Sequence, residues 1–173
     1  MTRTAIAYWL LPREPERAFF ARVIHELAAR FGAPEFEPHL TLFVAPNKSP
    51  APAEILHAIG TVRLNLRVLG LRWSVQFTKT FFAQFECSNE IQELSDAICA
   101  LTYGERSAID PHLSLLYKRL PEQTTREFAA SIQLPFKEVI FDSLCAMRCA
   151  SPTRNAADVR AWKLIAAQNS NTR

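Results

Sequence analysis

Two stretches of the sequence nearly repeat each other: PHLTL at residues 38–42 and PHLSL at residues 111–115. Each has the alternation of a β-strand, in which residues two positions apart point to the same face. One face of each strand carries leucines that suit a hydrophobic core, and the other carries a histidine beside a hydroxyl. The candidate functional groups are the four side chains on that second face: His39, Thr41, His112 and Ser114.

The first stretch follows a strand and a helix. Residues 5–11 form a short apolar run with aromatic side chains, which predicts a strand. Residues 19–31 carry apolar side chains every three to four positions, which predicts a helix with one buried face. Pro15 suits the first turn of this helix, and Gly32 suits the position just past its end.

The second stretch follows the same two elements. Residues 80–87 predict a strand rich in Phe, and residues 91–101 predict a helix with one apolar face. Ser88 or Asn89 suits the N-cap of this helix, and Gly104 suits its end. The two histidines lie 73 positions apart and the two terminal glycines lie 72 apart. Strand, helix and motif therefore repeat nearly in register, which indicates a duplication.

The predicted fold class is α+β, with two small antiparallel sheets lining a central cleft and helices outside. Further elements are expected as helices at 53–60 and 121–132 and as strands within 61–77, 136–148 and 159–167. The length suits one domain, residues 1–173. Its pseudo-repeat halves are expected at about 1–60 and 75–135, and the C-terminal strands should complete the first lobe.

Composition excludes several classes of protein. The chain has 49% hydrophobic and 21% charged residues, and no apolar stretch approaches the length of a membrane span. The sequence contains neither a GxGxxG nor a GxxxxGK[ST] motif, which excludes dinucleotide-binding and P-loop folds. The net charge of +3 suits an anionic small substrate without requiring nucleic acid.

The four cysteines contain no CxxC pair, so neither a zinc ribbon nor a thioredoxin motif is expected. We expect buried thiols. Cys145 and Cys149 would bond only across a bent backbone, because residues four apart on a regular strand are about 13 Å apart. The apolar run at residues 5–11 lacks the small-residue cleavage site of a secretory signal, which favours a cytoplasmic location.

The paired imidazoles and hydroxyls suit phosphoryl chemistry without a metal. Imidazoles titrate near neutral pH and act as base and acid, while hydroxyls and an imidazolium hold phosphate oxygens. The alternative for each motif is a structural, hydrogen-bonded histidine, which a single HxT would favour. The duplication favours a catalytic pair. His25 and His57 have no such partner, so we expect them in solvated or capping roles.

The motifs resemble those of the two-histidine (2H) phosphoesterase superfamily, and the resemblance covers nearly the whole chain. Within it, FEPHLTL at 36–42, PHLSLLY at 111–117 and YWLLP at 8–12 resemble the cyclic phosphodiesterases of plant and yeast type. The resemblance implies a hydrolase that needs neither metal nor cofactor. It would open ADP-ribose 1″,2″-cyclic phosphate or nucleoside 2′,3′-cyclic phosphates to phosphomonoesters.

The resemblance also implies a role for each site residue. The implied roles are catalysis by His39 and His112, phosphate binding by Thr41 and Ser114, and lining of the substrate pocket by Trp9 and Tyr117. Tyr117 has the strand parity of Leu113 and Leu115, so it reaches the histidine face only if the strand bends or ends near Leu116. The near symmetry of the two halves leaves open which histidine is the base.

Other interpretations stay open. An RNA-end-processing 2H enzyme of the 2′,5′ ligase or phosphodiesterase type would act on RNA 3′ ends, although the basic residues here are scattered rather than striped. A nucleotide-binding module without turnover would not need all four polar groups. A zinc site at the two histidines would need a third ligand such as Asp110. We expect a monomer with a cyclic-phosphate nucleotide as substrate and no membrane partner.

Several neighbours of the motifs are secondary candidates. Those that would bring charge or hydrogen bonds to the phosphate, with a solvated edge as the alternative, are Lys79, Thr80, Lys118 and Arg119. The polar loops at 47–52 and 105–110 are candidates to gate the cleft because they follow or precede the motifs.

Overall fold

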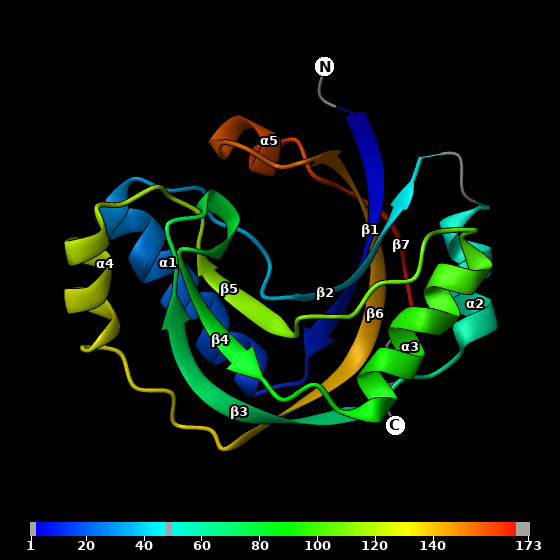
Figure 1. Ribbon diagram of the computed structural model, residues 1–173, viewed down its shortest axis with the longest axis horizontal. Coiled ribbons are helices and arrows are strands. Elements are labelled where there is room, and N and C mark those ends of the chain that lie inside the picture. The colour runs from blue at the N-terminus through cyan, green and yellow to red at the C-terminus, as the bar shows by residue number, and fades with distance from the viewer. Residues whose placement is uncertain (1–2, 48–49, 169–173) are drawn as a thin grey trace.

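The computed structural model describes residues 3–47 and 50–168 (Figure 1). Its strands are β1 (Arg3–Pro12), β2 (Leu40–Pro46), β3 (Leu64–Trp73), β4 (Phe81–Phe85), β5 (His112–Leu116), β6 (Glu138–Ser151) and β7 (Lys163–Ala167). Its helices are α1 (Glu16–Phe31), α2 (Pro52–Ile59), α3 (Asn89–Leu101), α4 (Glu122–Ala129), α5 (Ala156–Arg160) and the short 3-10 helix η1 (Phe77–Lys79). The predicted α+β fold class is confirmed.

Local sequence explains most of the element boundaries. Gly32 takes the left-handed conformation (φ 61°) and terminates α1, as predicted. Ser88 caps α3, because its hydroxyl accepts a first-turn backbone N–H at 3.4 Å. The prediction of one strand at 159–167 was wrong in its first residues. The Asn155 side chain caps α5, which buries Val159, and β7 starts only afterwards.

Gly104 does not terminate α3 in the way predicted. The helix ends at Leu101, and the residue with a positive φ is Tyr103 (55°). Gly104 instead packs against the ring of Phe43, where an added Cβ would lie 2.4 Å from the nearest ring carbon. The glycine is therefore required by close packing between the halves rather than by the turn.

The seven strands of the described residues form one antiparallel sheet in the order β1-β2-β5-β4-β3-β6-β7, and β1 also pairs with β6. The first residues of β6 pair with β3, and the rest pair with β1. The two sheets expected from the sequence are thus joined into one, in which the pairing of β1 with β6 closes a ring of six strands and β7 pairs with β6 outside it. The motif strands β2 and β5 are neighbours at a single residue pair, Leu40 with Leu113.

The helices pack across the duplication. α1 of the first half packs on β5 of the second, and α3 of the second half packs on β2 of the first. In Figure 1, α1 and α4 lie to one side of the strands, α2 and α3 lie to the other, and α5 stands apart above them. The main core includes the motif leucines, which are at most 4% exposed, as predicted: Leu40, Leu42, Leu113 and Leu115.

A second, smaller cluster of buried residues lies on the other face of β1 and β6. It contains Trp9, Cys145 and Cys149, with Trp162 packed against it. All four cysteines are free, and three are buried as predicted. Cys87 corrects that prediction, because it lies exposed just past the end of β4.

The predicted gating loop at 47–52 includes residues 48 and 49, which lie outside the described residues. Among the helices that the structure describes, none is both long and apolar enough to cross a membrane.

Candidate active site

The two motifs meet where β2 and β5 pair. Leu40 faces Leu113 in antiparallel register, so continuation of the register sets His39 opposite Ser114 and Thr41 opposite His112. Opposite residues of an antiparallel pair share a face, and diagonal positions are separated by about 7 to 8 Å. The four predicted polar side chains therefore lie on one face of the sheet, with the histidines on a diagonal.

Each imidazole is held by a hydrogen bond to the backbone carbonyl two residues before it. Nδ1 of His39 lies 2.6 Å from the carbonyl oxygen of Glu37, and Nδ1 of His112 lies 2.7 Å from that of Asp110. A carbonyl oxygen only accepts, so each Nδ1 carries the proton and donates it. In the neutral ring this leaves Nε2 as a proton acceptor on both histidines. The two histidines therefore share the same tautomer as well as equivalent positions in the repeat.

His39 occupies an apolar environment. The ring is 4% exposed and stacks on the indole of Trp9, with the centroids 3.6 Å apart and the planes 12° apart. Burial lowers the pKa of His39 to about 4, the bond to the Glu37 carbonyl raises it, and nearby His112 lowers it. The carboxylate of Glu37 binds Arg17 at 2.6 Å. His39 is therefore neutral at pH 7.

His112 occupies a more polar environment. Its side chain is 26% exposed, and a carboxylate oxygen of Asp110 lies 3.8 Å from Nδ1. The same carboxylate pairs with Lys79 and accepts a bond from Gln84 at 2.9 Å. Burial lowers the pKa of His112, the bond to the Asp110 carbonyl raises it, Lys79 lowers it and the Asp110 carboxylate raises it. An imidazolium is thus better supported at His112 than at His39.

The two hydroxyls differ in their surroundings. Ser114 is 3% exposed, and its hydroxyl donates to the carbonyl oxygen of Thr78 in η1 at 2.7 Å. Its lone pairs remain able to accept, and donation to a ligand would require the hydroxyl to rotate. Thr41 is half-buried and pairs with Trp9 across β1 and β2. Thr41 is therefore the more accessible of the two.

The predicted aromatic residues both lie on the histidine side. β5 ends at Leu116, so Tyr117 escapes the strand parity and stacks on Phe36, with the centroids 4.1 Å apart. Burial raises the pKa of the Tyr117 phenol, while a hydrogen bond with Ser114 lowers it. Trp9 is 2% exposed, and His39 covers one face of its indole. Its geometry suits the support of His39 better than stacking with a substrate base.

Trp162 completes this aromatic group and was not among the predicted site residues. It follows α5, 45 positions beyond Tyr117, and its ring lies perpendicular to those of His39 and Tyr117, 5.8 and 5.6 Å away. No motif or repeat surrounds it in the sequence. Its one signal was its position in a predicted strand of the first lobe.

The secondary candidates separate into structural and peripheral residues. Thr80 is 1% exposed and binds the carbonyl oxygen of Lys118, which joins η1 to the end of β5. The ammonium of Lys118 reaches the carbonyl oxygen of Gly32 at 3.4 Å, and Arg119 is exposed. Of the four, Lys79 alone is tied to a motif histidine, through Asp110. The two histidines outside the motifs, His25 and His57, are both exposed.

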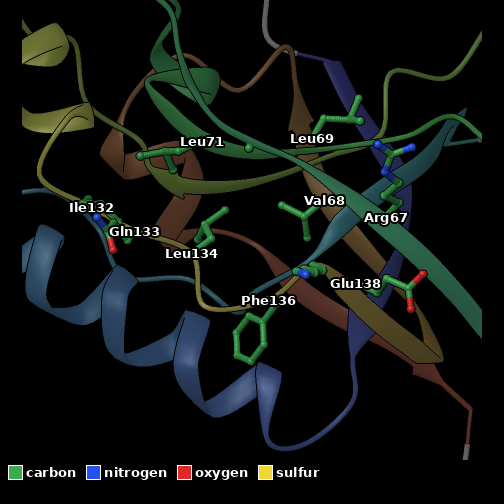
Figure 2. Close-up of a pocket in the computed structure, with 11 residues that line it drawn as sticks. Arg67, Val68, Leu69, Leu71, Ile132, Gln133, Leu134, Phe136 and Glu138 are labelled. Atoms are coloured by element: carbon green, nitrogen blue, oxygen red, sulfur yellow. The ribbon is translucent and has the colours of Figure 1, made fainter.

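No group of three or more His, Cys, Asp or Glu side chains among the described residues is placed to hold a metal ion. A surface hollow of about 830 Å³ lies between β3 and residues 132–138 (Figure 2). Its lining includes Leu69, Phe136 and Glu138, but no residue of either motif. This hollow and the histidine pair are therefore separate features.

Comparison with solved structures identifies the fold. E. coli LigT complexed with ATP aligns with a TM-score of 0.56 at 11% identity, over 97% of this chain and 98% of that chain. LigT complexed with 3′-AMP aligns with a TM-score of 0.55 at 11% identity, over 95% and 96%. A structure described as a phosphoesterase aligns with a TM-score of 0.56 at 10% identity, over 96% and 97%. No protein-family model matches the chain, and no curated protein matches its sequence.

The chain therefore has the same fold as LigT, which agrees with the α+β class that the two motifs predicted. At 10–11% identity the likeness concerns the fold alone, because one fold can carry many different functions.

Proposed function

We propose that the protein is a metal-independent cyclic phosphodiesterase in which His39 and His112 act as the acid/base pair. The observation that carries the proposal is the antiparallel meeting of the two motifs at Leu40 and Leu113. It sets two imidazoles, each with Nδ1 bound to a carbonyl, diagonally across one face with a hydroxyl beside each. A phosphate between the imidazoles would contact an acid, a base and two hydroxyls at once.

The unequal surroundings of the histidines support unequal roles. His39 is buried and neutral, so its Nε2 is available to accept a proton. His112 has the Asp110 carboxylate 3.8 Å from Nδ1, whereas the carboxylate of Glu37, its counterpart beside His39, is bound to Arg17. We therefore assign His39 as the general base and His112 as the general acid in hydrolysis.

In the proposed hydrolysis each histidine transfers one proton. A water oxygen attacks phosphorus and gives its proton to Nε2 of His39. The bond from phosphorus to one ribose oxygen breaks, and that oxygen takes a proton from Nε2 of His112. The product is a phosphomonoester, and proton exchange with solvent restores both rings. Thr41 and Ser114 would hold the non-bridging oxygens, with the Ser114 hydroxyl turning from the carbonyl of Thr78 to do so.

A substrate panel tests the proposal and its alternatives. Nucleoside 2′,3′-cyclic phosphates, ADP-ribose 1″,2″-cyclic phosphate and an oligonucleotide with a 2′,3′-cyclic end would be incubated with the protein in excess EDTA. Turnover of the small substrates to phosphomonoesters is the expected result. Turnover of the oligonucleotide alone would favour RNA-end processing, and binding without any turnover would favour a nucleotide-binding module.

The role assignment has its own test. A nitrophenyl phosphodiester has a leaving group that departs without a proton, so loss of a general acid matters little for it. We expect His112→Ala to lose much less activity on this ester than on a cyclic phosphate, and His39→Ala to lose activity on both. The opposite pattern would exchange the two roles.

A further inference from the structure

Trp162 is positioned by rigid elements around it. Its backbone N–H donates to the carbonyl oxygen of Val159 at 3.2 Å, and Val159 is the buried residue of α5. The Asn155 side chain caps α5 through two backbone N–H groups at 2.9 and 3.0 Å. On its other side the chain enters β7, which pairs with β6. The backbone is therefore held in place on both sides of Trp162, and this fixes the position from which the indole enters the site.

Two stacked ring pairs surround the indole. Trp9 lies on His39 and Phe36 lies on Tyr117, both at an interplanar angle of 12°. Trp162 is steeply inclined to all four rings, at 71° to 84°. It fills the corner between the two stacks, one of which contains the proposed base.

The indole N–H of Trp162 is buried and has no hydrogen-bond partner among the described residues. An indole donates only, and a buried donor without an acceptor is costly. The rings around it offer at most a weak N–H···π contact. A donor left unpaired beside a catalytic ring is expected where the bound ligand supplies the acceptor.

We propose that Trp162 is a substrate-binding residue whose indole N–H donates to a non-bridging phosphate oxygen held between the two histidines. The inference deepens the proposed function and rests on it for the position of the phosphate. A phosphate oxygen is the acceptor expected next to His39, and hydrogen bonds to charged oxygens are the strong ones. One face of Trp9 lies against His39 and one face of Phe36 lies against Tyr117, so a base has few open ring faces here.

The test is phosphate binding by Trp162→Phe, measured by calorimetry with inorganic phosphate as the ligand. Trp73→Phe is the matched control, because it makes the same chemical change at the end of β3, where Arg126 lies over the indole. We expect Trp162→Phe to weaken phosphate binding about tenfold. KM for a cyclic phosphate should rise in the same variant, and Trp73→Phe should match the wild type in both measurements.

A second variant separates the donor from the packing. Benzothienylalanine at position 162 keeps the bicyclic shape and lacks the N–H, so it should reproduce the tenfold loss even if Phe perturbs the fold. Wild-type affinity in this variant, an equal loss in Trp73→Phe, or no phosphate binding by the wild type would overturn the inference. Phosphate binding that depends on the N–H without any turnover of cyclic phosphates would instead uphold the inference and refute the proposed function.

Discussion

Replacing Asp110 by Asn should lower the pKa of His112. The carboxylate oxygen lies 3.8 Å from Nδ1, and the Asp110 side chain is 59% exposed, so a water-like dielectric applies. Coulomb's law then gives about 1 kcal/mol for the attraction between carboxylate and imidazolium, or about 0.8 pKa unit. Asn keeps the size of the side chain, and the variant also leaves the Lys79 ammonium unpaired beside His112. Both changes act in the same direction.

The assay combines an NMR titration of the imidazole Cε1–H with the pH dependence of kcat/KM. Because His112 is the proposed acid, activity falls as the pH rises through its pKa. The alkaline limb in Asp110→Asn should move to lower pH by about 0.8 unit, a loss of roughly sixfold above the limb. Glu37→Gln is the control, because Arg17 already binds that carboxylate; the pKa of His112 should stay unchanged. A pKa of His112 that rises or stays constant in Asp110→Asn would refute this reasoning.

The remaining predictions concern stability and pH. Burial lowers the pKa of His39 to about 4 in the folded protein, against 6.5 in the unfolded chain. Neutral His39 therefore contributes its full share of the folding stability above pH 6.5, and this share is lost as the pH falls toward 4. Between pH 6.5 and 4 the free energy of unfolding, measured in urea, should fall by about 3 kcal/mol more in the wild type than in His39→Gln. Trp9→Ala should cost about 3 to 5 kcal/mol in the same assay and lower kcat, because the support of His39 is removed; wild-type kcat would contradict the stacking role. Gly104→Ala should cost about 1 to 3 kcal/mol because its Cβ would meet Phe43, and an unchanged midpoint would show that the ring yields freely.

The sequence predicted those features that local chemistry determines. Alternation placed each histidine beside a hydroxyl and opposite core leucines, and Gly32 marked the end of α1. Gly104 shows the limit: its counterpart in the repeat ends a helix, but packing against Phe43 explains the glycine here. That contact joins residues 61 positions apart in the sequence, so no local sequence pattern predicts it.

The site was predicted in part for the same reason. Its four polar residues came from a short repeated motif, whereas Trp162 reaches the site through the pairing of β6 with β1 and β7. Strand parity placed Tyr117 on the core side, but the end of β5 releases it. The different surroundings of the two histidines depend on Lys79 and Arg17, which lie in η1 and α1. Lys79 was a candidate for the phosphate, but its pairing with Asp110 and the pairing of Arg17 with Glu37 are tertiary contacts that the sequence did not predict.

The paired-histidine mechanism is tested most directly by turnover of a nucleoside 2′,3′-cyclic phosphate in excess EDTA by the wild type, His39→Ala and His112→Ala. His57→Ala is the matched control, because that histidine is exposed on α2. General acid or base assistance is worth about 10² to 10⁴-fold, so each motif variant should lose at least two orders of magnitude while remaining folded. Turnover by either motif variant at the rate of the wild type and His57→Ala would contradict the account.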